Sequence, residues 1–229
     1  MNDTRKSADK SVVLAITGAS GAIYALRLLE VLLVADRHVH LTISPAARLV
    51  LAHELGLELE LDKLDARLLL VAKDSPARKK MPPAISEVLS GSAAASHGRE
   101  GKLTYHHYAD LIAPIASGSF LTDAMVICPC SGSTLGAVVH GTGENLIHRA
   151  AGVHLKERRT LVLVPRETPL SSIQLENMRR AVDAGAVVLP AMPGFYHGPA
   201  SIRDLVDFVV ARICDQLNID NSLVRRWGS

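Results

Sequence analysis

The stretch between residues 12 and 33 constrains the fold more than any other part of the chain. An apolar run at residues 12–16 leads into Thr17-Gly18-Ala19-Ser20-Gly21-Ala22, and apolar residues then recur at helical spacing over residues 23–33. This pattern predicts a strand, a tight turn and a helix. Such a turn directs backbone N–H groups and a helix N-terminus at one point, which suits a phosphate group.

Two common nucleotide-binding patterns are excluded. The turn reads G-x-x-G, and the second predicted strand, residues 38–43, ends in Ser44-Pro45 without the acidic residue that holds a ribose of NAD. The G-x-x-x-x-G-K-[ST] sequence of nucleoside triphosphatases is also missing. A phosphomonoester such as FMN fits a small Gly/Ser pocket better, but the turn alone does not establish it. A sharp connection with nothing bound remains the alternative.

Length and composition indicate the fold class. The 229 residues can bury a sizeable core, so we expect one domain spanning residues 1–229. Hydrophobic residues make up 48% of the chain and aromatic residues only 3%, which is typical of parallel strands covered by helices. We therefore expect an α/β fold, a three-layer Rossmann- or flavodoxin-like open parallel sheet with helices on both faces. A mean hydropathy of +0.20 favours a homo-oligomer that covers apolar surface.

Charge and cysteine content exclude several kinds of partner and location. A net charge of +2 produces no strong positive potential that would attract nucleic acid. The polar residues 1–10 lack the apolar region of a secretory signal, and no run of about 18 apolar residues predicts a membrane span. The three cysteines suit a reducing cytoplasm. We interpret Cys128 and Cys130 as packing residues, and we expect no metal site because no set of ligands has zinc-site spacing.

The pattern is weaker between residues 57 and 107 and at the C-terminus. Residues 57–71 are consistent with one helix. Residues 72–104, rich in Pro, Gly and Ser, are predicted to form a mobile surface insertion with a short helix near residues 85–89. Residues 218–229 are predicted to form a tail that docks on the site or on a neighbouring subunit, because the tail carries the only tryptophan, Trp227.

A second polar turn lies farther along the chain. The predicted strand at residues 124–129 is followed by Cys130-Ser131-Gly132-Ser133-Thr134 and a helix, and the strand at residues 160–165 ends at Arg166-Glu167. Turns at the carboxyl ends of parallel strands form one crevice. Arginine binds phosphate through several donors, and glutamate can transfer a proton. The sequence therefore predicts a crevice with an anion site at this edge. Glu54, near a predicted helix end, has an exposed surface carboxylate as its plainer interpretation.

Several longer motifs occur together in the chain. They are Thr17-Gly18-Ala19-Ser20-Gly21-Ala22, Pro114-Ile115-Ala116-Ser117-Gly118-Ser119, Met125-Val126-Ile127-Cys128-Pro129-Cys130-Ser131, Leu155-Lys156-Glu157-Arg158-Arg159, Leu163-Val164-Pro165-Arg166-Glu167-Thr168-Pro169, Pro193-Gly194-Phe195-Tyr196-His197, Leu205-Val206-Asp207-Phe208-Val209-Val210-Ala211-Arg212 and Arg226-Trp227-Gly228. Together they resemble the UbiX-like flavin prenyltransferases, within the wider family of homo-oligomeric FMN-binding flavoproteins. The resemblance covers nearly the whole chain except residues 57–110.

The resemblance implies a reaction and an assembly. Members of this family join a dimethylallyl group from dimethylallyl phosphate to N5 and C6 of reduced FMN without a metal. The product, prenylated FMN, is the cofactor of UbiD-type (de)carboxylases. The resemblance also implies a homododecamer built from trimers, with active sites between subunits. It leaves open whether the monophosphate or the diphosphate is the true prenyl donor.

The resemblance also implies roles for particular residues. FMN would contact Gly18, Ala19, Ser20, Ser44, Ser117, Ser131, Gly132, Ser133, Thr134 and Arg166. The prenyl phosphate would be held by Arg149, Lys156, Arg166, Glu167, Tyr196 and Arg212, with Trp227 closing the pocket. Arg149 and Lys156 would come from a neighbouring subunit. Lys156 and Glu167 would act on the leaving phosphate, while Ser20 and Glu54 would transfer protons during ring closure at the flavin.

The chain departs from the family pattern at two places, and two alternative functions remain open. Leu111 stands where many members carry a tryptophan beside the prenyl pocket, and the glycine of Ser131-Gly132-Ser133-Thr134 is shifted from the common Ser-Thr-Gly-Thr. One alternative function is an FMN-dependent cysteine decarboxylase of the same fold. The other is a carrier that binds FMN without chemistry, although a carrier has no use for a second anion site.

Overall fold

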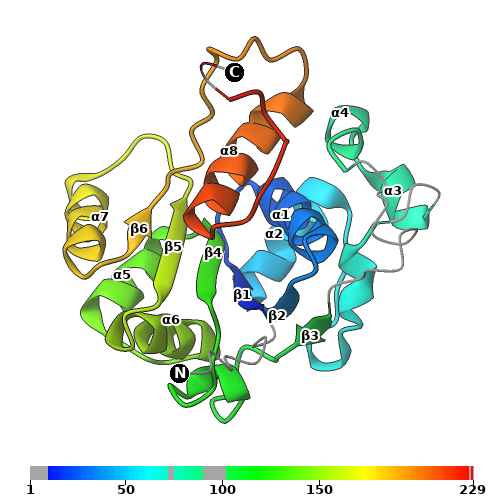
Figure 1. The fold of residues 1–229 in the computed structure, drawn as a ribbon. Coiled ribbons are helices and arrows are strands. Elements are labelled where there is room, and N and C mark those ends of the chain that lie inside the picture. Colours follow the sequence, from blue (N-terminus) through cyan, green and yellow to red (C-terminus); the bar gives the residue numbers. More distant parts are fainter. Residues whose placement is uncertain (1–9, 72–74, 90–101, 227, 229) are drawn as a thin grey trace, which may run out of the picture.

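A computed structural model describes residues 10–71, 75–89, 102–226 and 228, and its centre is one parallel sheet (Figure 1). Six strands lie in the order β3-β2-β1-β4-β5-β6. Their bounds are Ser11–Ile16 (β1), His38–Ile43 (β2), Leu103–Tyr105 (β3), Ala124–Cys130 (β4), Thr160–Pro165 (β5) and Val187–Val188 (β6). All the paired strands are parallel, which confirms the predicted open α/β sheet.

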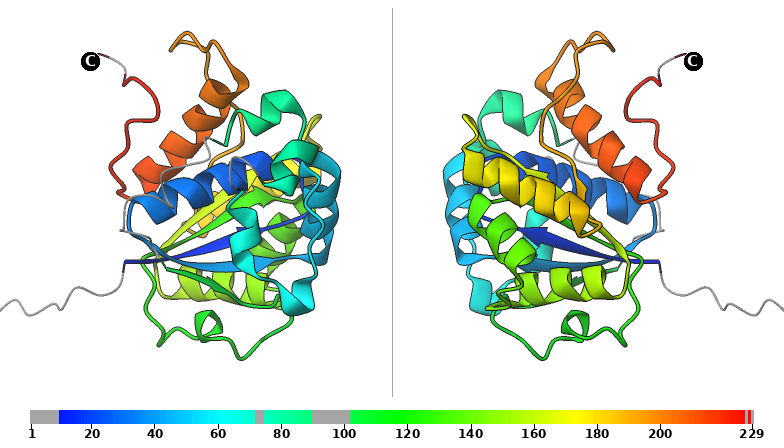
Figure 2. Two further views of the ribbon diagram at one scale, coloured as in Figure 1. Left: turned by 90° about the vertical axis from the view of Figure 1, so that its right-hand side faces the viewer. Right: turned by 90° about the vertical axis from the view of Figure 1, so that its left-hand side faces the viewer.

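Helices cover both faces of this sheet. The helices are Ala22–Val34 (α1), Pro45–Leu55 (α2), Pro76–Lys80 (α3), Pro83–Ser86 (α4), Gly132–His140 (α5), Leu146–Lys156 (α6), Ser172–Asp183 (α7) and Ile202–Gln216 (α8). One buried cluster joins the sheet to α1, α2 and α8, and the other joins it to α5, α6 and α7. Figure 2 shows the helices on either side of the central strands, and the predicted three-layer arrangement is therefore confirmed.

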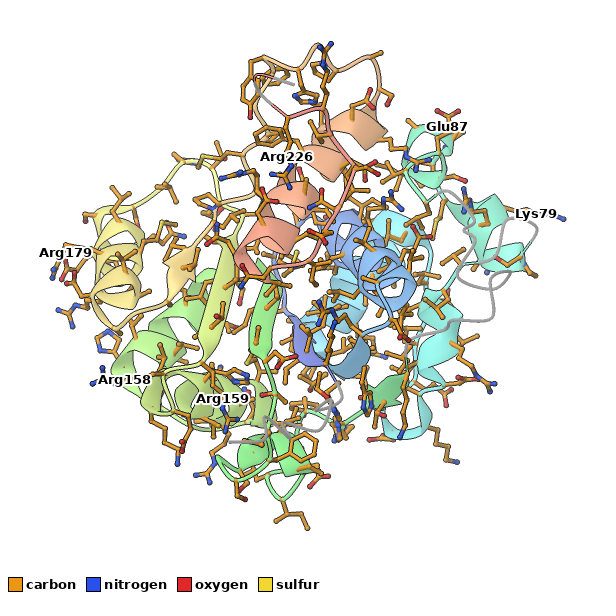
Figure 3. All side chains as sticks on the ribbon, viewed as in Figure 1. Lys79, Glu87, Arg158, Arg159, Arg179 and Arg226 are labelled. Carbon is orange, nitrogen blue, oxygen red and sulfur yellow. The ribbon has the colours of Figure 1, made fainter. Side chains whose placement is uncertain are left out.

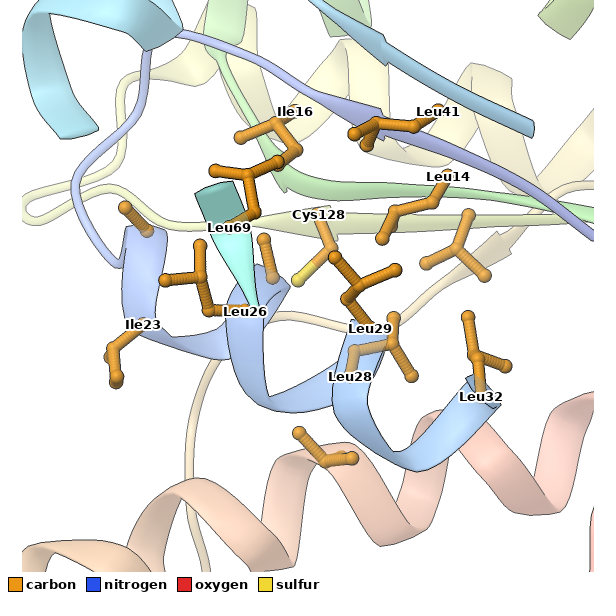
Figure 4. Close-up of a cluster of buried hydrophobic side chains, with 14 of the residues drawn as sticks. Leu14, Ile16, Ile23, Leu26, Leu28, Leu29, Leu32, Leu41, Leu69 and Cys128 are labelled. Carbon is orange, nitrogen blue, oxygen red and sulfur yellow. The ribbon is translucent and has the colours of Figure 1, made fainter. Parts of the chain in front are cut away.

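The apolar residues of β1 explain why the sheet is buried on both sides. Leu14 and Ile16 face the first cluster, whereas Val13 and Ala15 face the second, and all four are almost fully buried. A strand covered on both faces needs a continuous apolar run rather than an alternating one. The close-up in Figure 4 shows the leucines of α1 packed against this strand and against Leu41 of β2.

The cysteines belong to this core. Cys128 lies in the first cluster (Figure 4) and Cys130 in the second, and both are buried. Burial disfavours the charged thiolate, so it raises the pKa of the Cys130 thiol to about 12 and also raises the pKa of Cys128. These thiols are packing groups, as predicted, rather than nucleophiles.

The prediction of one helix over residues 57–71 is wrong. The chain is largely extended there, with short 3₁₀ turns at Leu61–Lys63 and Ala66–Leu69. The reason lies in the sequence: Leu57, Leu59 and Leu61 are buried, while Glu58 and Glu60 between them are exposed. This alternation with a period of two belongs to extended backbone, not to a helix.

The described part of the expected insertion packs against the domain. Met81, Val88 and Leu89 are buried in the first cluster, and the short helix α4 begins and ends earlier than predicted. Leu103–Tyr105 forms the edge strand β3, paired with β2, where no strand was predicted. Residues 72–74 and 90–101 of the expected insertion lie outside the described residues.

The described part of the C-terminal tail contacts its own chain. The side chains of Asn221 and Arg226 both donate to Asp215 near the end of α8, and the Arg226 nitrogen lies 2.9 Å from the carboxylate. Among the helices that can be described, none is long and apolar enough to cross a membrane.

Candidate active site

A cavity of about 510 Å³ lies where the carboxyl ends of β1, β4 and β5 meet. The turn after β1 and the turn after β4 both line it, as the topology argument predicts, and Arg166 and Glu167 line it beside them. The lining residues are Gly18, Ala19, Ser20, Ser131, Gly132, Ser133, Arg166, Glu167, Ser171, Ile173, Gln174 and Asn177. One chain therefore brings together many of the residues that the sequence singled out.

Thr17 joins the two turns, a role that the sequence analysis missed. Its hydroxyl donates to the Pro129 carbonyl at 2.7 Å and accepts the Ser131 N–H at 2.8 Å. Its own N–H donates to the same Pro129 carbonyl, and the residue is only 1% exposed. The signal available in the sequence was a hydroxyl residue directly after a wholly apolar strand, where a buried polar group needs partners.

Replacing Thr17 with Val is expected to lower the free energy of unfolding by about 1–3 kcal/mol, because the Ser131 N–H then loses its partner while the shape is retained. Urea unfolding at fixed protein concentration measures the change. Thr17→Ser, which keeps the hydroxyl, is the matched control and should lie close to the native protein. Equal stability of the Val variant and the native protein would show that the hydroxyl does not hold the turns together.

Gly18 and Gly21 of the first turn are required for two different structural reasons. Gly21 has a φ of +103°, in the left-handed region that residues with a Cβ rarely adopt. Gly18 has room only for hydrogen, since a Cβ there would lie 2.5 Å from the Cβ of Ala46 in the first turn of α2. Gly18 thus serves helix packing, whereas Gly21 permits the sharp entry into α1.

The N-terminus of α1 is paired with Glu54, which corrects the expectation of bare N–H groups there. The Glu54 carboxylate accepts hydrogen bonds from the N–H groups of Gly21 and Ala22, each at 3.0 Å. A carboxylate is a favourable partner for a helix N-terminus because the helix dipole is positive there. Glu54 therefore lies directly beside Ser20, and the first turn of α1 already holds an anionic group.

The N-terminus of α5 is the open anion site. Ser131 caps this helix: its hydroxyl accepts the Thr134 N–H at 3.3 Å and donates to the Thr134 hydroxyl at 3.0 Å. Within the described parts of the chain, the N–H groups of Gly132 and Ser133 have no acceptor. Donors at a helix N-terminus that face a cavity suit a phosphate. Thr134 is buried behind them and does not line the cavity.

Arg166 and Glu167 supply the opposite charges of the site. The Nε of Arg166 donates to the Ser20 carbonyl at 3.3 Å, which ties the end of β5 to the first turn. Glu167 accepts the Thr168 N–H at 3.2 Å and the side-chain amide of Gln174 at 3.3 Å. The guanidinium and the carboxylate are thus both anchored at the same cavity.

The start of α7 contributes residues that the sequence analysis did not assign. The Gln174 carbonyl accepts the Ser171 N–H while the Ser171 hydroxyl accepts the Gln174 N–H, which forms a capping box. The remaining Gln174 amide donor is the one that reaches Glu167. The S-x-x-Q sequence directly after Arg166-Glu167 is the signal that predicts such a cap.

Lys156 and Ser117 lie away from this cavity. Lys156 ends α6 shortly before β5 begins, at the amino edge of the sheet, and a strand of six residues spans about 20 Å. Arg159, labelled near α6 in Figure 3, donates to the carbonyls of Gly118 and Phe120, so the loop with Ser117 is held at the same edge. Within one chain, neither residue can reach a ligand bound beside Arg166.

The remaining predicted residues also lie outside the cavity lining. Ser44 caps α2 by accepting the Ala47 N–H, and Arg149 is exposed on α6. Tyr196 is 60% exposed on the loop before α8. Arg212 lies late in α8, where it pairs with Asp215 at 2.8 Å. Trp227 lies outside the described residues.

The cavity has the donors for a phosphorylated ligand but not those for a metal. Across the described ranges, no three His, Cys, Asp or Glu side chains are grouped to hold a metal ion. A phosphomonoester instead finds hydroxyls at Ser20, Ser131 and Ser133, the free N–H groups of α5, and the Arg166 guanidinium. The residues present therefore fit FMN.

Comparison with known proteins agrees with this chemistry. The family model Flavoprotein matches residues 1–214. The flavin prenyltransferase UbiX of Pseudomonas aeruginosa is 49% identical over 222 residues, which cover 97% of this chain and 96% of that protein. The crystal structure of AnUbiX (PadA1) in complex with FMN and dimethylallyl pyrophosphate has a TM-score of 0.76 and 34% identity, and the match covers 97% of this chain and 99% of that one.

A third relative is a dodecameric, FMN-dependent UbiX-like decarboxylase from Escherichia coli O157:H7. Its TM-score is 0.73 and its identity 35%, and the match covers 96% of this chain and all of that one. Identities of this size over almost the full length confirm the resemblance that the motifs indicated. The chain belongs to the UbiX flavin prenyltransferase family of flavoproteins.

Proposed function

We propose that this protein is a flavin prenyltransferase that transfers a dimethylallyl group from dimethylallyl phosphate to N5 and C6 of reduced FMN. The observation that carries the proposal is one cavity in which the open N-terminus of α5 adjoins an anchored Arg166–Glu167 pair. Such a cavity offers one anion site for the FMN phosphate and further charge for a second phosphate. The identity to the Pseudomonas aeruginosa enzyme supports the same reaction.

The FMN phosphate is assigned to the start of α5. The donors at the start of this helix face the cavity. They are the N–H groups of Gly132 and Ser133 and the hydroxyls of Ser131 and Ser133. Gly18, Ala19 and Ser20 also line the cavity, and Ser44 and Thr134 lie outside its lining, at the starts of α2 and α5. When bound and reduced, FMN supplies the nucleophilic N5 and C6 atoms.

The second phosphate is assigned to Arg166 and Glu167. Arg166 binds the phosphate oxygens of the prenyl donor, and Glu167 gives or takes the proton of the leaving phosphate as the carbon–oxygen bond breaks. Glu54, near the end of α2, accepts the N–H of Gly21, the residue that follows Ser20. This placement supports their assignment to proton transfer at the flavin ring.

A neighbouring subunit completes the site in this proposal. Arg149, Lys156 and Ser117 lie away from the cavity of their own chain, and Tyr196 and Arg212 are also outside its lining. Exposed apolar side chains such as Ile112 and Leu121 offer surface for subunit contacts. The dodecameric relative from Escherichia coli supports a dodecamer. In this proposal the sites lie between its subunits and Trp227 closes them.

The product and its destination follow from the same assignment. Prenylated FMN would pass to a UbiD-type (de)carboxylase. A cytoplasmic location is supported by the three free, buried cysteines.

Leu111 is 45% exposed on the loop after β3. Because leucine is smaller than the tryptophan of many family members, it would make the prenyl pocket wider at this position.

The test is anaerobic incubation of the protein with reduced FMN and dimethylallyl phosphate, followed by mass analysis of the bound flavin. Prenylated FMN is the expected product, and a parallel reaction with the diphosphate identifies the better donor. Unchanged FMN that remains bound in both reactions would instead indicate a carrier. Release of carbon dioxide from a peptide with a C-terminal cysteine would indicate the decarboxylase.

A further inference from the structure

The loop before α8 contains a cluster of three aromatic rings built around Phe208. The ring of Tyr196 meets Phe208 edge-on, with centroids 5.6 Å apart and an interplanar angle of 80°. His197 stacks on Phe208 at 5.4 Å and 15°, and it also meets Tyr196 edge-on at 6.0 Å. Edge-on and stacked aromatic pairs at these distances are attractive and have defined orientations. Tyr196 therefore has its ring plane set by two neighbours.

Gly194 fixes the cluster from the backbone side. A Cβ at this position would lie 3.0 Å from Cζ of Phe208 and 3.0 Å from Cε1 of Tyr196. The main chain therefore passes directly against both rings, and neither ring can move toward it. Both ring nitrogens of His197 are buried and have no hydrogen-bond partner in the described structure, so His197 serves here as a flat packing surface.

Two members of the cluster differ in how they are held: Phe208 is fixed on a helix, whereas Tyr196 is exposed on a loop. Phe208 lies on α8, next to Asp207, whose buried carboxylate is 2.6 Å from Arg27 of α1. The start of α8 is fixed by the capping box of Ser201 and Asp204. Tyr196 lies on the loop and exposes more than half of its surface. The orientation of an exposed loop side chain is thus imposed by a helix bonded to the core.

We propose that Phe208 is a positioning residue that holds the Tyr196 hydroxyl ready for the prenyl phosphate. This inference rests on the proposed function, in which Tyr196 binds that phosphate. An ordered side chain loses less conformational entropy when it binds a ligand, and a hydroxyl contributes fully only when it is held in the right geometry. Removing the Phe208 ring should therefore weaken binding of the prenyl donor through Tyr196 alone.

The test is a double-mutant cycle read as KM for dimethylallyl phosphate. Tyr196→Phe removes only the hydroxyl, and Phe208→Leu removes only the ring beside it. We expect Phe208→Leu to raise KM about tenfold in the native background and to leave KM unchanged in the Tyr196→Phe background, since there is no hydroxyl left to position. The dissociation constant of FMN should stay within twofold in all variants.

Two further variants separate positioning from general damage. Phe195→Leu replaces an exposed aromatic residue that neighbours Tyr196 in sequence, and it should leave KM within twofold. Gly194→Ala brings a Cβ to within 3.0 Å of both rings, which must shift by a few tenths of an ångström. It should raise KM in the same direction, and it replaces Phe208→Leu as the test if Phe208→Leu folds poorly. A rise in KM that is equal in both backgrounds, or no rise in either, would overturn the inference. Absence of prenylated FMN with the native protein would overturn the proposed function instead.

Discussion

Replacing Glu167 with Gln lowers the rate of prenylated FMN formation about a thousandfold and leaves FMN binding within twofold. Gln has the same shape and can still accept the Thr168 N–H, so the end of β5 keeps its structure. Its amide cannot take up or release a proton, and positioned general acids and bases contribute about 10²–10⁴-fold. FMN binding is spared because its phosphate is assigned to α5 rather than to Glu167.

Two measurements check this result. Anaerobic single-turnover assays give the rate, and fluorescence titration gives the dissociation constant of FMN. The matched control is Gln174→Ala, which removes the amide that donates to Glu167 but keeps the carboxylate. Its rate should fall far less, by about tenfold or less, because a typical intramolecular hydrogen bond contributes about 0.5–1.5 kcal/mol. A Glu167→Gln variant that no longer retains FMN would contradict the role assigned to Glu167.

Replacing Asp207 with Ala lowers the free energy of unfolding by about 3–5 kcal/mol, because it leaves the buried Arg27 guanidinium without its main partner. Arg27, Glu30 and Asp207 are each less than one-tenth exposed and join α1 to α8. Arg27 lies 2.6 Å from Asp207 and 3.0 Å from Glu30. Burial raises the pKa of Glu30, so Glu30 alone is a poor replacement for the lost carboxylate.

Urea unfolding at fixed protein concentration measures this change. The control is Arg203→Ala, which removes a second partner of the Asp207 carboxylate. The Arg203 Nε lies 3.3 Å from that carboxylate, and the Arg203 side chain is more exposed than Arg27. Because the Arg203 side chain is partly exposed to water, this ion pair stabilises by about 1 kcal/mol or less, and the control should unfold near the native midpoint. Equal effects of the two substitutions would show that the Arg27–Asp207 pair is not the link between α1 and α8.

The sequence predicted the arrangement of the sheet well because the strong signals were local. An apolar strand, a glycine turn and an amphipathic helix define β1 and α1, and Gly21 indeed adopts a positive φ. Ser201 caps α8, where a serine directly before an apolar helical pattern is a typical start signal. The carboxyl-edge crevice followed from the topology of parallel strands, since successive turns must meet at the same edge. The alternating residues 57–61 misled because a short run of leucines can fit either period, and the short edge strand β3 was not predicted.

The site was less predictable where it depends on contacts between distant segments. Nothing in the local sequence shows that Glu54 reaches the N-terminus of α1, or that Thr17 reaches Pro129. Gln174 was recognisable as a helix cap, but not as a partner of Glu167. Such pairings depend on how elements far apart in the chain pack, and motif spacing does not contain that information.

The separation of Lys156 from Glu167 within one chain determines how the subunits must assemble if both residues act on one ligand. Glu167 lies at the carboxyl end of β5 and Lys156 precedes its amino end, so one strand length lies between them. If both residues act on one prenyl phosphate, they must come from different chains. A closed oligomer meets this requirement, because every subunit then offers each edge to a neighbour.

The most direct test of this account mixes two inactive variants, Lys156→Ala and Glu167→Gln, in the same oligomers. The two chains are co-expressed with different tags, purified as hybrids, and assayed anaerobically for prenylated FMN. Each variant alone should be nearly inactive, whereas random hybrids should regain about one quarter of the native rate, since half of the sites keep each residue. Hybrids that show no more activity than their parents would contradict a prenyltransferase site shared between chains.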